Sequence, residues 1–312
     1  MNFIVSTSPH IHSKITTSNI MRDVCIALLP TLIASLVIFG AQALLVTMVC
    51  VVAAMGSEYL FEKTCKLPIT VQDFSAVVTG LLVAYNLPVT IPLWQAALGS
   101  VIAIVLVKQL FGGLGRNFAN PAIVGRIILF LSFSKTMTAW QFPDAVSSAT
   151  PLALMASGNT AALPSLWDMF LGMKGGCLGE VSGLALLLGF AYLLIRRIIS
   201  WHTPVAFVGT VFLLSWLLDG SPVYALYQIL SGGLLLGAIF MATDYVTSPL
   251  TKLGQIVYGI GCGIITILIR YFGGYSEGVT YAILCMNACS VLLDKIGRPV
   301  KFGAPKKEAA KK

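Results

Sequence analysis

Charged residues are scarce in this 312-residue sequence, because Asp, Glu, Lys and Arg together make up only 10% of it. A soluble domain carries about 25% charged residues, which form its water-exposed surface. The shortage therefore excludes a soluble globular protein of this size. Seven cysteines without a Cys-x-x-Cys pair are also too few for a disulfide scaffold. Apolar residues, by contrast, make up 57% of the sequence. This high fraction excludes a disordered chain and indicates an all-α polytopic membrane protein.

Basic residues outnumber acidic ones, for a net charge of +8, and residues 301–312 contribute half of that excess with five Lys and one Glu. A basic tail beside a membrane explains this pattern better than a nucleic-acid groove does. We therefore expect a lipid bilayer and no nucleic acid as partner. No cleavable leader is expected, because the first long apolar run begins near Val24 without a cleavage pattern after it.

Apolar runs suited to bilayer-crossing helices, which need about 20 residues, recur along the whole chain. The pattern predicts ten of them. The predicted spans cover residues 24–40, 42–60, 70–87, 92–108, 119–134, 180–197, 203–218, 223–242, 254–271 and 279–293.

The distribution of basic residues predicts the orientation of these spans. With the N-terminus in the cytoplasm, 16 of the 20 basic residues fall inside, Lys135, Lys174 and Arg270 fall outside, and Arg126 lies within a span. Such an asymmetry is the positive-inside signal. We expect a multi-pass protein of a prokaryotic cell membrane with both termini cytoplasmic. Its segments are a cytoplasmic N-terminal segment 1–23, a first membrane half 24–134, an external loop 135–179, a second membrane half 180–293 and a basic cytoplasmic tail 294–312.

Two stretches echo each other about 160 residues apart, Lys108–Gly113 and Ile269–Gly274. Each half of the chain would then hold five spans, and an odd number inverts the second copy relative to the first. The pattern predicts two five-helix inverted repeats with helices broken near Asn86-Leu87-Pro88 and Asn120-Pro121. Chance recurrence in a glycine-rich chain is the alternative. Broken helices must line a protein-enclosed cavity, because lipid cannot satisfy their free backbone groups.

The external loop contains Asp144-Ala145-Val146-Ser147-Ser148-Ala149-Thr150-Pro151. Pro151 disfavours a helical Thr150, which predicts an extended segment with an accessible hydroxyl. From composition alone, this is an ordinary surface turn.

The same stretch, however, resembles the Asp-x-x-Ser-x-Ala-Thr motif on which flavin transferases attach FMN to Thr through a phosphoester, with Ser148 where that family often has Gly. Further stretches are equally distinctive, namely residues 112–122, 240–249 and 275–282 and Arg298-Pro299. Through them the chain resembles the membrane subunits that include the D subunit of the Rnf ion-translocating complex and the B subunit of the sodium-pumping NADH:quinone reductase. The short N-terminal segment favours the Rnf branch.

The resemblance implies a urea-transporter-like fold of ten helices and an electron-transport function. Thr150 would carry covalent FMN, while Asp144, Ser147 and Ser148 would serve the transferase or surround the flavin. A second, non-covalent flavin, riboflavin, is also implied. The complex as a whole would link ferredoxin and NAD to Na⁺ or H⁺ translocation. This subunit would have no activity alone, and its partners would be the other subunits and the flavin transferase.

Ionisable groups in the membrane are functional candidates by default, because each costs at least about 2.5 kcal/mol at a helix centre. Arg126 could form a buried pair, for instance with Asp244 of the opposite half, or contact a cofactor. Arg270 is a further candidate, whereas Asp73 is expected at the interface. Polar groups near the breaks could satisfy backbone atoms or bind flavin; they are Asn86, Asn117, Asn120 and Thr243.

No metal site is expected. Cys285 and Cys289 lie in an apolar run, His10 and His12 in a polar tail, and His202 beside Arg196 at the interface. Gly112-x-x-Gly115 lacks a βαβ context and is not a dinucleotide site. Two alternatives to an electron-transfer subunit stay open, a small-solute channel or secondary transporter and a structural anchor with a vestigial motif.

Overall fold

The computed structural model describes residues 15–140, 150–157, 162–273 and 277–296. Within these ranges the regular structure is entirely helical, with no strand. The prediction of an all-α protein is therefore confirmed for the described residues.

The first half begins with two long helices that turn back on each other at Gly40, whose φ of +71° is open to glycine at no steric cost. Later helices are shorter and are interrupted by polar connections. The elements are α1 (Thr17–Phe39), α2 (Ala41–Thr64), η1 (Val71–Asp73), α3 (Ser75–Tyr85), α4 (Leu93–Ile102), η2 (Ala103–Gln109) and α5 (Pro121–Ser132). η2 continues α4 as a π-helix, a form found often at functional sites.

The second half follows a connection that carries three short helices, α6 (Ser134–Met137), α7 (Pro151–Ala156) and α8 (Leu166–Leu171). Its own helices include a second π-helical segment, η4. The elements are α9 (Gly183–Ile195), α10 (His202–Asp219), α11 (Pro222–Leu230), α12 (Leu234–Leu236), η4 (Gly237–Met241), α13 (Lys252–Phe272) and α14 (Val279–Leu293).

The helices have the length and composition of a polytopic membrane protein. Among the described residues, α1, α2, α10 and α13 are long and apolar enough to cross a bilayer, and α11 with α12–η4 forms a fifth candidate bent by 69°. The five remaining apolar helices are shorter, at 10–17 residues. Each of the ten predicted ranges overlaps a helix or consecutive helices.

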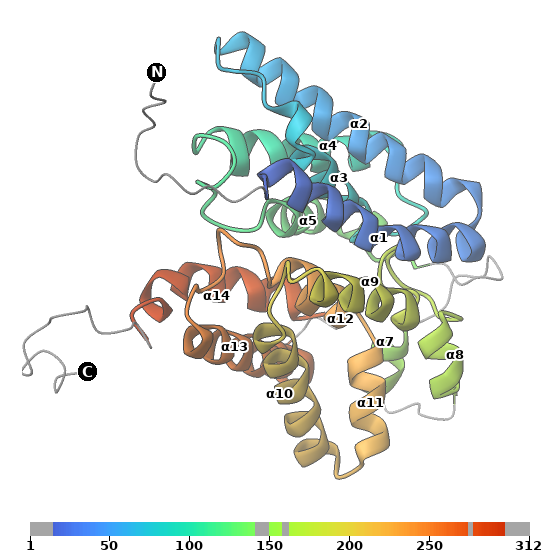
Figure 1. The fold of residues 1–312 in the computed structure, drawn as a ribbon. Helices are drawn as coiled ribbons and strands as arrows, with labels where there is room; N and C mark the ends of the chain where they lie inside the picture. Colours follow the sequence, from blue (N-terminus) through green and yellow to red (C-terminus); the bar gives the residue numbers. More distant parts are fainter. Residues whose placement is uncertain (1–14, 141–149, 158–161, 274–276, 297–312) are drawn as a thin grey trace, which may run out of the picture.

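The two halves lie against each other, with α1–α5 in the upper part of Figure 1 and α9–α14 in the lower part. One apolar core runs through both halves. Glycines allow close helix approach: a Cβ at Gly80 would lie 2.8 Å from the Val51 Cα, and one at Gly259 would lie 2.8 Å from the Thr203 carbonyl oxygen. Small residues at helix contacts are typical of membrane proteins.

Helix ends inside this core find backbone partners in other segments. α3 stops at Tyr85, and the segment before α9 returns to its end. Leu178 N–H donates to the Leu87 carbonyl at 3.0 Å, and Gly179 N–H donates to the Tyr85 carbonyl at 2.9 Å. These contacts give hydrogen bonds to carbonyl groups that lipid could not provide. The segment before α9 therefore stabilises the break after α3.

Candidate functional site

Four of the predicted polar residues gather around one cavity at the start of α5. Asn117, Asn120, Thr243 and Asp244 all line a space of about 210 Å³, which we call the α5 cavity. Asn117 Nδ2 donates to Asp244 Oδ2 at 3.4 Å, and Asn120 Nδ2 donates to the Met241 carbonyl at 3.2 Å. The cavity is therefore formed jointly by the start of α5 and the end of η4.

Local capping holds these side chains in place. Asn120 is the N-cap of α5, where its Oδ1 accepts from Ala122 N–H at 3.0 Å, and Pro121 follows as the first helical residue. Asp244 Oδ2 also accepts from Thr247 Oγ1 at 3.0 Å. The amide and carboxylate groups are thus fixed before any ligand arrives.

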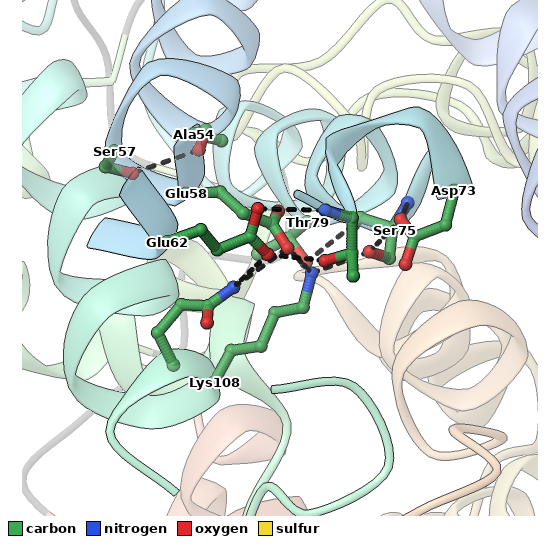
Figure 2. A network of polar contacts seen from close by, with 10 residues as sticks. Ala54, Ser57, Glu58, Glu62, Asp73, Ser75, Thr79 and Lys108 are labelled. Atoms are coloured by element: carbon green, nitrogen blue, oxygen red, sulfur yellow. Dashed lines mark hydrogen bonds and ion pairs between the residues drawn. The ribbon is translucent and has the colours of Figure 1, made fainter. Parts of the chain in front are cut away.

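A buried ion pair adjoins this cavity. Lys108, at the end of η2, lines the α5 cavity and is 2% exposed. Its Nζ donates to Glu58 Oε1 and to Ser75 Oγ, both at 2.6 Å, and Gln109 Nε2 donates to Glu58 Oε1 at 2.9 Å. Figure 2 shows the Lys108 amino group directed between the α2 carboxylates and Ser75. We call this group the Lys108 network.

The Lys108 network was not predicted, and Lys108 was counted among the basic residues of the inner surface. The structure buries it because Glu58 lies on the face of α2 that packs on the rest of the first half. A signal was available: Glu58 is a single carboxylate inside the apolar run 42–60. Carboxylates there rarely face lipid.

Arg126 has a different partner from the one suggested by the sequence. Its Nη1 donates to Asn86 Oδ1 at 2.7 Å, and its Nη2 donates to Glu277 in a salt bridge. The suggested pairing with Asp244 is wrong, because Asp244 bonds Asn117 and Thr247 at the α5 cavity. The interpretation of Arg126 as a buried ion pair between the halves is correct.

More buried charges surround that pair. Lys174 is 2% exposed and Glu180 4% exposed, and the Glu180 Oε2 has no hydrogen-bond partner among the described residues. Arg270 donates from Nη1 to the Gln228 carbonyl at 2.7 Å and from Nη2 to the Ser231 carbonyl at 3.0 Å. We call Arg126, Lys174, Glu180, Arg270 and Glu277 the Arg126 cluster.

The charges of the Arg126 cluster do not cancel. Three cations face two carboxylates, which leaves one positive charge in excess. Burial lowers the pKa of the Lys174 ammonium, and the Glu180 carboxylate opposes that shift. Cys177, Glu180 and Glu277 could together reach one metal ion. A further cation would add to the excess, so this group suits an anion better than a metal.

The turn between α11 and α12 passes through the Arg126 cluster. A Cβ at Gly232, whose φ is +66°, would lie 2.8 Å from Leu152 Cδ1 and 3.1 Å from Arg270 Nη2. A Cβ at Gly233 would lie 3.8 Å from Glu180 Oε2. The bend of the fifth candidate span thus brings buried charges, α7 and the second half together.

Thr150 caps α7 beside this cluster. Its φ of −63° and ψ of 156° confirm the predicted extended conformation, and its Oγ1 accepts from Ala153 N–H at 3.3 Å. The predicted accessibility is wrong, because Thr150 is 8% exposed. A cavity of about 540 Å³, the α7 cavity, lies against the same helix; its lining includes Leu152, Met155, Tyr224, Gln228, Arg270 and Tyr271.

The other predicted residues fall elsewhere. Asp144, Ser147 and Ser148 lie outside the described residues, as do His10 and His12. Asp73 accepts from Ser75 N–H at 2.8 Å at the start of α3. Asn86 joins the Arg126 cluster rather than the α5 cavity, and its Nδ2 lies 3.6 Å from the Met241 Sδ.

Comparisons with known proteins agree with one another. The model of the NQR2, RnfD, RnfE family matches residues 4–303. The chain is 46% identical to the D subunit of the Na⁺-translocating ferredoxin:NAD⁺ oxidoreductase complex of Acetobacterium woodii, over 98% of this chain and 97% of that protein. It is 42% identical to the proton-translocating counterpart of Clostridium ljungdahlii, over 96% of each, and 36% identical to the D subunit of the ion-translocating oxidoreductase complex of Alcanivorax borkumensis, over 97% of each.

Proposed function

Because the chain belongs to the NQR2, RnfD, RnfE family, we propose that it is the flavin-carrying D subunit of an ion-translocating ferredoxin:NAD oxidoreductase complex. It acts as part of a translocase and has no activity alone. Its ferredoxin and nicotinamide sites belong to partner subunits. The similar relatives are named for Na⁺ and for protons, so both ions fit the proposal.

Thr150 is the residue that carries this proposal. It is the acceptor position of the Asp-x-x-Ser-x-Ala-Thr motif, and it lies on the helix that borders the α7 cavity. FMN esterified to Thr150 would have a cavity of about 540 Å³ within reach, in the range of 300–1,000 Å³ typical of small-molecule sites. A bound flavin supplies electron transfer in one- or two-electron steps, while the protein positions it and adjusts its electronics.

The ten-helix arrangement is part of the same proposal, with two inverted five-helix halves and both termini in the cytoplasm. Equivalent positions support it. Glu58 of α2 meets Lys108 at the end of η2, and Asp219 of α10 accepts a hydrogen bond from Tyr271, two residues after the position that the repeat matches with Lys108. The start of α5 meets the end of η4, and Glu277, before α14, meets Asn86, after α3, through Arg126.

The second flavin of the proposal, non-covalent riboflavin, is assigned to the α5 cavity. Two amides, hydroxyl groups, the Asp244 carboxylate and the Lys108 ammonium line it, as a polar heterocycle requires, while most of the lining is apolar. The volume of about 210 Å³ encloses part of such a ligand, and the remainder would extend beyond the cavity.

The proposed partners are the other subunits of the complex and the flavin transferase that modifies Thr150. A small-solute channel of the same fold is the competing function. Such a channel does not need a threonine that accepts FMN. In addition, the Arg126–Glu277 salt bridge lies at the break where the two halves meet, where a channel would need an open path. The flavin motif is therefore the feature that separates the two functions.

The test of the proposal is the mass and fluorescence of the denatured protein. From cells that contain the flavin transferase, the chain should give a flavin-fluorescent gel band and the mass of an FMN adduct, and Thr150→Ala should abolish both. Thr138→Ala, which changes an exposed threonine of the same connection, is the matched control and should keep the adduct. A wild-type chain of unmodified mass would exclude covalent FMN.

A further inference from the structure

We propose that the isoalloxazine ring of the flavin on Thr150 lies in the α7 cavity, where the Arg270 guanidinium faces it and raises its midpoint potential. The inference rests on the proposed attachment of FMN to Thr150. It adds the place of the ring and a residue that sets its electronic properties.

Thr150 lies close enough to the α7 cavity for an attached flavin to enter it. Leu152, Met155 and Ala156 follow the helical spacing that places residues on one face of α7, and all three line the cavity. Thr150 caps the same helix, two residues before Leu152. A phosphoester on the Thr150 hydroxyl therefore begins next to the cavity wall, and the ribityl chain of FMN can extend along this face.

The lining of the α7 cavity suits a planar, polar ring. Tyr224 and Tyr271 offer aromatic faces from α11 and α13, on which a planar ring can stack. Gln228 adds a hydrogen-bonding amide to the same lining, and Asp219 adds a carboxylate. Tyr271 is itself held by its hydrogen bond to Asp219, so the aromatic wall is fixed.

Arg270 places a positive charge at the α7 cavity. Arg270 lines the α7 cavity and belongs to the Arg126 cluster, which carries one positive charge in excess. Its Nη atoms are occupied by Gln228 and Ser231, but its Nε is buried and has no hydrogen-bond partner among the described residues. Because this Nε is not accessible from the cavity, Arg270 acts on a ring there through its charge, which favours a ligand that becomes negative. The Asp219 carboxylate lines the same cavity and opposes that charge in part.

A flavin meets that requirement more strongly after it accepts electrons, because the electrons place negative charge on the pyrimidine edge of the ring. A guanidinium beside this edge stabilises the reduced ring relative to the oxidised ring. Positive charge near a flavin is one of the main means by which a protein raises its potential. No additional oxidant or reductant is needed, since the electrons are those that the complex already transfers.

The experiment compares Arg270→Met and Arg270→Lys in the full chain, purified from cells with the flavin transferase. Lys135→Met is the matched control, because it removes a positive charge from an exposed residue of the α5–α7 connection that does not line the cavity. The midpoint potential of the flavin is titrated by absorbance, and the FMN adduct is measured by mass.

Arg270→Met should lower the midpoint potential with the adduct intact, by 59 mV for each tenfold loss of one-electron stabilisation. Arg270→Lys should retain most of the wild-type value, and Lys135→Met should match wild type. An unchanged potential in Arg270→Met with a full adduct would overturn the inference. An adduct missing from wild type would instead refute the attachment itself, so the two failures are distinguishable.

Met155→Phe gives an independent test if Arg270→Met does not fold. The larger phenyl side chain narrows the α7 cavity without changing any charge, and it does not itself quench flavin fluorescence as an indole would. The ring should then leave the quenching tyrosines, so the flavin fluorescence of the native protein should rise while the adduct remains. Unchanged native fluorescence would show that the ring lies elsewhere, as would an increase that Leu154→Phe, outside the cavity lining, produces equally.

Discussion

The α5 cavity and the Arg126 cluster lie at two helix breaks, one before α5 and one before α14, yet they differ in charge. At the α5 cavity, the start of α5 meets the end of η4 through two asparagines and one carboxylate. At the Arg126 cluster, Glu277 before α14 meets the end of α3 among three cations. The first break encloses space, whereas charged side chains occupy the second.

The two helix starts are built differently. Asn120 caps α5 with its side chain, and the cap lines the α5 cavity. Gly278 precedes α14 and provides no side-chain cap, and the adjacent Glu277 pairs with Arg126. The break before α5 has space for a ligand, whereas the charges at the break before α14 set the electrostatic potential of their surroundings.

The two regions are nevertheless close. Met241 accepts from Asn120 at its carbonyl and from Asn86 at its sulfur, and Asn86 in turn accepts from Arg126. One residue at the end of η4 thus contacts both breaks. Changes that act on one region alone are therefore the way to separate their roles.

The largest expected contrast is in labelling from the two sides of the membrane. Cys65 is exposed in the connection after α2, on the side of the Lys108 network, and should react with an impermeant thiol reagent only after permeabilisation. A cysteine introduced as Lys135→Cys, in α6 after α5, should react in intact cells. Reaction of Cys65 in intact cells would reverse the proposed orientation.

Removing the central cation should have the next largest effect. Arg126→Met leaves the partly buried carboxylate of Glu277 without its partner, and the cost of about 3–5 kcal/mol for breaking a fully buried pair is the upper bound for this loss. The free energy of unfolding in detergent should fall accordingly. The double variant Arg126→Met with Glu277→Gln should recover much of this loss, because it removes both charges. Equal losses in the single and double variants would show that the pairing is not the stabilising contact.

The sequence alone predicted much of the fold but less of the charge pairing. Apolar length and the breaks near Pro88 and Pro121 located the ten apolar helical segments, because a helix surface in lipid must be apolar and an interrupted backbone marks a break. The short helices α6, α7 and α8 were not predicted, since they lie in the stretch that was expected to be a loop. Four polar residues of the α5 cavity were also identified, since they flank the breaks. The partner of Arg126 was not identified. Hydropathy does not show that the connection before α14, which carries Glu277, folds back into the protein. The burial of Lys108 was missed for a similar reason. The positive-inside rule assigns basic residues to one side of the membrane and does not consider a pairing with Glu58 of a neighbouring helix.

The smallest effect is expected at the break before α5, where a single amide is removed. Asn117 lines the α5 cavity and bonds Asp244, so Asn117→Ala should weaken a non-covalent flavin by about tenfold, the loss of one hydrogen bond of about 1.4 kcal/mol. Acid-released flavin, measured per covalent FMN, should fall on dilution, while the covalent FMN itself and the stability effect of Arg126→Met stay unchanged. Asn19→Ala, at an exposed position near the start of α1, is the control and should release no additional flavin. If Asn117→Ala keeps its full flavin content, the second flavin lies outside the α5 cavity, and the contrast between the two breaks is one of packing alone.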